Sequence, residues 1–479
     1  MNPTRHLTAV PLLPTIGLLA IGLLALAGCT SPVGSQASGI DAPDAWSRLW
    51  GKDKQDASGN LPLASTDATD IEQRWWQSFN DPALDQLIDG ALANNKTLKI
   101  AEARVAEARA GRGGAEANLY PQVSVTGAVS RGNQGYATSN KPINVREADL
   151  QASWEVDLFG KNQARVAEAT AILQSEDAHR QAVLVSLLAE VARNYFDLRD
   201  YQEQIAITRR NLATQQRTLD LIKVQLQGAL SSDLDVERAA AQVSTTSAQL
   251  PALQSASEVT LDHLNILLGS PPGTRDAWLS TSTPLQPLAP TVLVAAPARV
   301  LANRPDVRAA ERSFAASLSA SDAASREIYP TVSLTALFGV QNSSLFNATP
   351  WGVGAGLVQP VLNFGRIQSD IDVADARQQQ AFLGYQETVL EALEDMENAL
   401  SLYLYETSRR QDLDHAAAQN RKAVDLANRQ YTAGYSGLLD LLVAQRDELA
   451  AESSLASSSA QLRKNLVHIY VAAGGGWKL

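Results

Sequence analysis

The sequence from Lys161 to Gln227 contains neither glycine nor proline, and this stretch limits the fold more than any other feature of the chain. Apolar residues recur in it at every seventh position: Leu184, Val191, Leu198, Ile205, Leu212, Leu219 and Leu226. A sustained heptad repeat predicts a helix that packs along one seam with a left-handed supercoil. At about 1.5 Å per residue, this helix would be on the order of 100 Å long. A compact globule cannot contain such a helix, so the long helices must build a tube or a rod.

The chain also contains an internal duplication. Tyr120-Pro121 recurs as Tyr329-Pro330 at an offset of 209 (329 − 120), and Phe159-Gly160 recurs as Phe364-Gly365 at an offset of 205 (364 − 159). Each copy is therefore predicted to contain a helix, two short segments, a very long helix and a return helix. The difference of four between the two offsets predicts a longer loop between the short segments of the first copy.

The short segments alternate between apolar and polar residues. In the first copy Trp154 and Val156 alternate with Glu155 and Asp157, and a period of two predicts strands. Each segment has about ten residues, the length of a transmembrane strand. Four strands cannot close a barrel and lipid does not tolerate open edges, so three chains would supply twelve strands. By the alternation, Glu155 and Asp157 should face the barrel lumen. The alternative is a pair of soluble hairpins on a coiled-coil stalk.

These patterns predict the boundaries of the parts of the chain. A signal peptide is expected at 1–28, an extended lipidated tether at 29–70, a first repeat at 71–270, a linker at 271–298 and a second repeat at 299–479. In the first repeat, strands are expected at 121–131 and 148–158, the long helix at 161–227 and the return helix at 231–268. In the second repeat, strands are expected at 330–340 and 351–362, the long helix at 366–433 and the return helix at 438–473. Pro251 should kink the first return helix or break it.

The N-terminus predicts export and a lipid anchor. A short basic start precedes an apolar run at 12–27, and this run is short for a membrane-spanning helix, which needs roughly 17–25 residues. The run ends in Leu26-Ala27-Gly28-Cys29, which resembles the lipobox of bacterial lipoproteins. The resemblance implies cleavage before Cys29 and acylation of its thiol and its new amine, and two or more acyl chains anchor a protein stably. Thr30 stands where an inner-membrane retention signal would place aspartate, which favours the outer membrane. The alternative is an ordinary secretory signal that carries a cysteine.

Composition argues against several classes of function. Cys29 is the only cysteine, so an internal disulfide is excluded. The five histidines are scattered, and no Cys/His cluster has the spacing of metal ligands. The net charge of −11 argues against a nucleic-acid partner. No nucleophile–base pair or phosphate loop suggests an enzyme, so we expect no catalytic residue, no metal and no cofactor apart from the covalent lipid on Cys29.

Several stretches, in order along the chain, together resemble one family. They are Arg74-Trp75-Trp76-Gln77-Ser78-Phe79-Asn80-Asp81-Pro82-Ala83-Leu84, Asn303-Arg304-Pro305-Asp306-Val307-Arg308-Ala309-Ala310-Glu311, Tyr329-Pro330, Phe364-Gly365-Arg366, 434–446 and Gly474-Gly475-Gly476-Trp477. The chain resembles the outer-membrane factors, the TolC-like outer membrane efflux proteins, and within them the lipoprotein (NodT-type) branch. The resemblance implies an α+β membrane protein: a homotrimer whose twelve-stranded transmembrane β-barrel is continuous with a twelve-helix coiled-coil α-barrel. A mixed equatorial region would use 271–298 and the chain ends.

The resemblance also implies a function and partners. It implies a lipid-anchored exit duct in the cell outer membrane, with a long periplasmic extension, that belongs to a tripartite efflux pump. Such a duct passively conducts drugs or small toxic compounds after docking to a periplasmic adaptor (membrane fusion) protein and an inner-membrane pump of the resistance-nodulation-division type. The alternatives are a duct for type I-like protein or glycolipid secretion, and a structural coiled-coil lipoprotein without a pore.

A gate is implied at the turn between each long helix and its return helix. In TolC-like ducts, acidic residues just after this turn ring the constriction, and a nearby tyrosine ties the helices shut. On this sequence the ring aspartate falls at Asp440 and the tyrosine at Tyr431, and Asp235 is the first-copy counterpart of Asp440. Two positions differ from the pattern of the family: Val443 stands where some members have a second ring aspartate, and Ser436 stands where some members have a gate arginine. A carboxylate ring in a narrow neck attracts cations. The alternative is that both aspartates only stabilise helix N-termini.

Overall fold

The structure is a computed structural model, and it describes residues 39–47, 63–66, 73–133, 142–274, 279, 285, 292–343 and 346–477. The signal peptide, Cys29 and most of the tether predicted at 29–70 lie outside the described residues. The described residues all belong to one compact unit, Ser38–Leu479.

Two helices of 67 residues each form the frame: α4 (Lys161–Gln227) and α10 (Arg366–Thr432). α4 covers the residues predicted for the first long helix, and α10 ends one residue before the predicted 433. Each helix follows a glycine in the left-handed conformation, Gly160 with φ 77° and Gly365 with φ 83°. A residue without a Cβ is needed there because the chain turns sharply from strand to helix. Within the described residues, no helix is both long and apolar enough to cross a membrane.

Shorter helices pack along these two. α3 (Lys96–Ala117) packs against α4, α9 (Pro305–Ser325) lies between α4 and α10, and α11 (Leu438–Ala472) contacts both long helices. The return helix predicted at 231–268 is divided in the structure into α5 (Asp233–Ser247) and α6 (Gln249–Leu267). The break falls three residues before Pro251, in line with the break expected from this proline, which then lies in the first turn of α6 where a missing N–H is tolerated.

Five strands form one antiparallel sheet: β2 (Gln122–Asn133), β3 (Pro142–Val156), β5 (Thr331–Ser343), β6 (Asn347–Ala348) and β7 (Trp351–Val358). The order is β2–β3–β5–β7, and β6 pairs with the end of β5. Among the described strands, β2 pairs only with β3 and β7 only with β5, so both outer edges of the sheet are unpaired.

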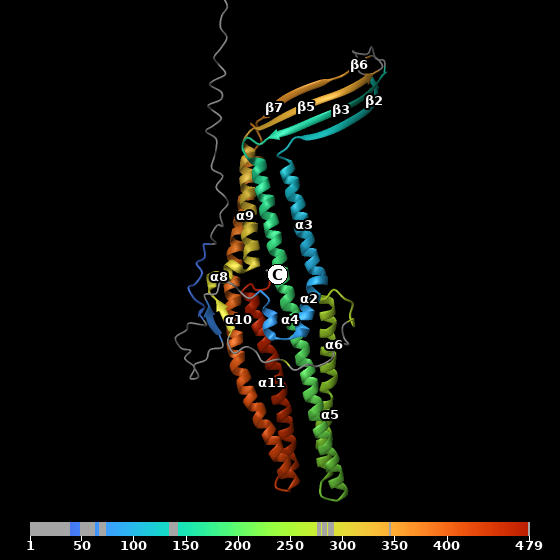
Figure 1. Cartoon of the computed structure of the whole chain (residues 1–479), viewed down its shortest axis with the longest axis vertical. Coiled ribbons are helices and arrows are strands. Elements are labelled where there is room, and N and C mark those ends of the chain that lie inside the picture. Colours follow the sequence, from blue (N-terminus) through green and yellow to red (C-terminus); the bar gives the residue numbers. More distant parts are fainter. Residues whose placement is uncertain are drawn as a thin grey trace, which may run out of the picture. The chain divides into compact units, whose positions relative to one another are not determined.

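The strand boundaries differ from the prediction by a few residues, and the largest differences are in β3 and β7. β3 begins at Pro142 rather than 148, because its first residues pair with β2 from Pro142 and with β5 from Val145. It ends at Val156 rather than 158. β7 ends at Val358 rather than 362 because Pro360 follows closely and has no N–H to donate. Figure 1 shows this sheet at one end of α3, α4, α9 and α10, and the turns after α4 and α10 at the other end.

Between these ends lies the main apolar core. Helices α2 (Pro82–Asn94) and α8 (Pro297–Asn303) and the short helix Trp75–Phe79 pack there against α4, α10 and α11. The ring of Trp75 stacks on Tyr470 with centroids 5.6 Å apart. A parallel pair that the sequence did not predict, β1 (Leu63–Thr66) with β4 (Val292–Ala295), lies beside it. Buried Trp46 joins this pair because its Nε1 donates to the Ala295 carbonyl at 2.8 Å.

Candidate functional site

The predicted gate residues lie at the ends of two helical hairpins, α4–α5 and α10–α11 (Figure 1). The turns are equivalent in the two repeats: Ala229 has φ 56° and Gly434, 205 positions later (434 − 229), has φ 77°. The left-handed conformation costs a residue with a Cβ about 1 to 2 kcal/mol, so Ala229 stores strain that Gly434 avoids.

Tyr431 connects one hairpin to the other. Its hydroxyl donates to Oε1 of Gln225, near the end of α4, at 2.7 Å. Its ring packs on an apolar cluster contributed by both hairpins: Leu219, Ile222, Ala239, Leu438 and Leu442. Burial, and then the negative charge of Asp235, raise the pKa of the Tyr431 hydroxyl. The hydroxyl therefore remains a neutral donor at physiological pH.

Two further hydrogen bonds join the hairpins above this cluster. Gln242 Nε2 of α5 donates to the Leu442 carbonyl of α11 at 3.1 Å. Gln445 Nε2 of α11 donates to Thr218 Oγ1 of α4 at 3.0 Å, and Gln445 is buried. We call these two bonds and the Tyr431–Gln225 bond the hairpin tie. Gln225, Gln242 and Gln445 could not be predicted from the sequence. Each is at least 200 residues from the residue it bonds, and no local pattern marks such pairs.

The two predicted gate aspartates differ in their surroundings. Asp235 completes a capping box: its Oδ2 accepts from Ser232 Oγ at 2.7 Å and from Ser232 N at 3.2 Å. These bonds lower the pKa of Asp235, and helix capping alone accounts for its position. Asp440 lies exposed in the first turn of α11. Within the described part of the chain it makes no hydrogen bond or ion pair, so its charge is free to act on the surroundings.

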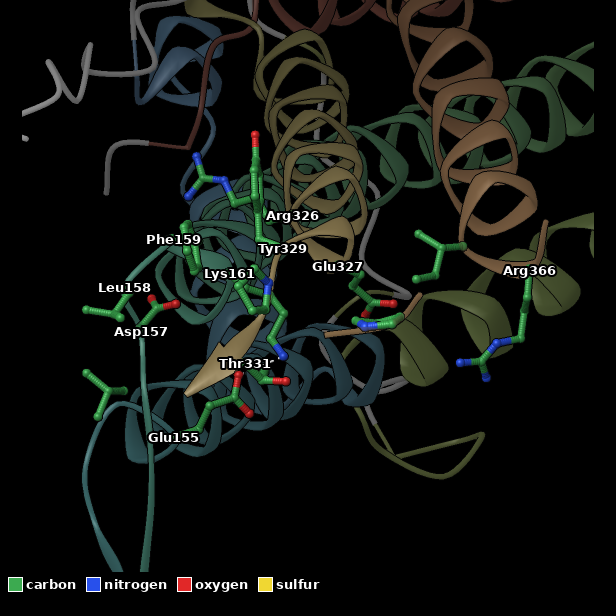
Figure 2. A pocket seen from close by; sticks show the side chains of 14 residues that line it. Glu155, Asp157, Leu158, Phe159, Lys161, Arg326, Glu327, Tyr329, Thr331 and Arg366 are labelled. Carbon is green, nitrogen blue, oxygen red and sulfur yellow. Dashed lines mark ion pairs between the residues drawn. The ribbon is translucent and has the colours of Figure 1, made fainter. Parts of the chain in front are cut away.

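The predicted lumen residues lie together at the opposite end, where β3 and β5 meet the first turns of α4 and α10. They line a pocket of 230 Å³, and Figure 2 shows Glu155, Lys161 and Arg326 around it. Glu155 forms an ion pair with Lys161 Nζ at 2.7 Å. The carboxylate of Asp157 accepts from the backbone N–H groups of Asn162 at 3.1 Å and Gln163 at 2.8 Å.

The prediction that Asp157 faces the barrel lumen assumed that this residue continues the strand, and the structure shows that the strand ends before it. β3 ends at Val156, so Asp157 is not a strand residue, and its carboxylate binds the free amides at the start of α4. The aromatic rings of Phe159 and Tyr329 stack beside it with centroids 5.0 Å apart, which ties the two repeats together at this junction. Glu155 remains a strand residue, and its lumen position stays a prediction.

Comparisons with known proteins agree with the duplication and the fold. A family model described as outer membrane efflux protein matches residues 87–270 and 296–475. The pyoverdine export outer membrane protein OpmQ of Pseudomonas putida is 31% identical, and the match covers 100% of this chain and 99% of that protein. The cation efflux system protein CusC of Escherichia coli is 30% identical, with 95% and 97% covered. Nodulation protein T of Rhizobium leguminosarum is 31% identical over 84% of each chain.

Two solved structures have the same fold. The outer-membrane channel OprN gives a TM-score of 0.81 at 30% identity and covers 93% of this chain and 100% of its own. The open state of the Neisseria gonorrhoeae MtrE outer membrane channel gives a TM-score of 0.77 at 27% identity, with 88% and 95% covered.

Proposed function

Because the chain belongs to the outer membrane efflux protein family, we propose that it is the outer-membrane exit duct of a tripartite efflux pump. It would passively conduct drugs or small toxic compounds out of the periplasm after docking to a periplasmic adaptor and an inner-membrane pump of the resistance-nodulation-division type. The observation that supports this proposal is the hairpin tie: three hydrogen bonds join the two hairpins at one end of the long helices, and the other end of these helices carries a sheet with two unpaired edges among the described strands.

A homotrimer would close the sheet. β2 and β7 each have a free edge in the described chain. Pairing β7 of one copy with β2 of the next would join the four long strands of three copies (β2, β3, β5 and β7) into a barrel of twelve. Closure satisfies every edge amide and carbonyl, as lipid requires. The large apolar side chains exposed on these strands, among them Val125, Phe338, Trp351 and Val353, support a lipid-facing surface.

The gate would lie where three copies bring their hairpin turns together. Asp440 is exposed and makes no hydrogen bond or ion pair with any described residue. A threefold ring of carboxylates in a narrow neck attracts cations and repels anions. The hairpin tie would hold the neck narrow, and its three hydrogen bonds would break when the hairpins separate.

Ion selectivity in planar bilayers tests the duct and its gate together. We expect wild-type channels to prefer cations, Asp440→Ala to reduce the preference, and Asp440→Arg to reduce it further or reverse it. Asp425→Ala removes an exposed carboxylate of α10 that is paired with Arg429, so it should leave selectivity unchanged. Identical selectivity in all four proteins would contradict the assignment of the gate to Asp440. A folded protein that never conducts, even with the adaptor added, would contradict the proposal that the protein is a duct.

The lipid anchor is tested by metabolic labelling. Cys29→Ser should abolish incorporation of radioactive palmitate, because Cys29 is the only cysteine in the sequence and the predicted site of acylation. Replacement of the neighbouring Thr30 by serine is the matched control and should keep the label. Continued labelling of the Cys29→Ser protein would refute the anchor.

A further inference from the structure

Three arginines converge on a groove that the proposed function does not use. The groove has a volume of 590 Å³, and its lining comes from α3, α4 and α9. Arg109 comes from α3, and Arg308 and Arg312, one helical turn apart, come from α9. We propose that this groove is a binding site for a phosphate group. We call it the arginine groove.

Arg308 is held in place and still has an unused donor. Its Nη2 donates to Gln181 Oε1 at 2.8 Å, and Gln181 Nε2 donates to Asp177 at 3.0 Å, which fixes the orientation of that amide. The guanidinium also lies over the ring of Trp477, 4.2 Å from its centroid. Its Nε is buried and has no hydrogen-bond partner among the described residues. Buried donors normally have an acceptor, so the guanidinium of Arg308, which lines the groove, still has hydrogen-bonding capacity that an oxyanion reaching this edge could use.

Positive charge in the groove exceeds the negative charge available to neutralise it. The lining residues carry three guanidinium groups and one carboxylate, that of Asp177, which already forms an ion pair with Arg180 at 3.2 Å. Arg312 contacts Glu311 at 3.4 Å, and Arg109 makes no ion pair or hydrogen bond within the part of the chain that the structure describes. This surplus stands out in a chain whose net charge is −11.

The electrostatics of Arg308 favour an added anion. Burial lowers its pKa, Asp177 raises it, and the positive charge of Arg312 lowers it again. A negative group placed between Arg308 and Arg312 would offset the desolvation cost of the Arg308 charge and the repulsion between the two guanidinium groups. Guanidinium groups bind carboxylate and phosphate with paired hydrogen bonds. Phosphate is the better match here because it carries up to two charges and offers oxygens in several directions to three guanidinium groups.

The phosphate could be free or part of a lipid headgroup, and the arginine groove would bind either through the same contacts. All of its residues come from one copy of the chain, so the proposal does not depend on the trimer or on the gate. Loss of phosphate binding would leave the conductance experiments unaffected, and failure of those experiments would leave this site untouched.

Calorimetric titration of the purified full-length protein in detergent tests the site with two probes, inorganic phosphate and dihexanoyl phosphatidic acid. We expect saturable binding that weakens about tenfold or more in Arg109→Gln and in Arg312→Gln, since each loses a charge-assisted contact. Arg104→Gln is the matched control: Arg104 is an exposed arginine of α3 that does not line the groove, and binding should be unchanged.

The two probes distinguish the sources of phosphate. Tighter binding of the phosphatidic acid assigns the site to a lipid headgroup, and equal or weaker binding assigns it to free phosphate; both results support the proposal. Absence of saturation with both probes, or an equal loss of affinity in Arg104→Gln and in the two groove variants, would overturn it.

Discussion

Arg304 is a buried cation that joins three parts of the chain. It donates to the Ala472 carbonyl at 3.2 Å and forms ion pairs with Asp306 at 2.6 Å and Asp395 at 3.2 Å. Its neighbour Asn303 donates to the Gly474 carbonyl at 2.7 Å. The stretches that begin at Asn303 and at Gly474, which both support the family resemblance, are thus joined by hydrogen bonds although they lie about 170 residues apart in the sequence. No local pattern predicts this contact.

Acid should weaken this junction through Asp395. His468 first, and then Arg304, hold the pKa of Asp395 below its ordinary value. A carboxylate whose folded pKa is lowered stabilises the fold above its unfolded pKa of about 3.9, and this stabilisation is lost as the pH falls through the folded value. Because the side chain is half exposed, Asp395→Asn should cost at most about 1 kcal/mol at pH 7 and less near pH 3.

Thermal melting in detergent as a function of pH measures this effect. Asp370→Asn, an exposed aspartate of the same helix, is the control and should melt like wild type at both pH values. A deficit for Asp395→Asn that is as large at pH 3 as at pH 7 would contradict the electrostatic explanation.

The duplicated turns between strand and long helix offer a matched pair of glycines. Gly160 and Gly365 have φ 77° and 83°, and both precede a 67-residue helix. Their surroundings differ, because a Cβ at Gly160 would collide with Arg326 whereas a Cβ at Gly365 would meet no atom within 4 Å. Arg326 Nη1 donates to the Gly160 carbonyl at 2.6 Å and would have to move.

Alanine at the two positions should therefore have unequal effects. Both variants bear the left-handed strain of about 1 to 2 kcal/mol, and Gly160→Ala should lose about 1 kcal/mol more with the displaced Arg326 contact. The lower melting temperature should belong to Gly160→Ala. Equal melting temperatures, or the reverse order, would show that the Arg326 contact does not stabilise the turn.

Helices and strands were predictable where one physical signal acts alone. The heptad and the absence of glycine and proline placed α4, and Pro251 predicted the break between α5 and α6. Alternation did not predict the surroundings of Asp157, because β3 ends one residue earlier and the carboxylate of Asp157 accepts from two backbone N–H groups in the first turn of α4. The pairing of β1 with β4 was not predictable, since two four-residue strands more than 200 residues apart carry little pattern of their own.

On the scale of the whole molecule, the hairpin tie joins two repeats that are far apart in sequence. The family resemblance placed Tyr431 and Asp440 at the turns, but it did not supply Gln225, Gln242 or Gln445, because a partner in another hairpin depends on the folded arrangement. The tie combines three side-chain hydrogen bonds with a small apolar cluster. A few kcal/mol of this kind would suit the proposed gate, which would have to hold the hairpins together at rest and let them separate when the duct opens.

Single-channel recording of Tyr431→Phe tests the central claim, that the hairpin tie keeps the duct shut. The variant keeps the ring in the apolar cluster and loses only the hydroxyl bond to Gln225, worth about 1 kcal/mol, so opening should become roughly fivefold more favourable for each copy. Tyr435→Phe is the control, because Tyr435 lies in the same turn with 86% of its surface exposed. More frequent or larger openings in Tyr431→Phe alone are the predicted result; identical openings in wild type and both variants would contradict it.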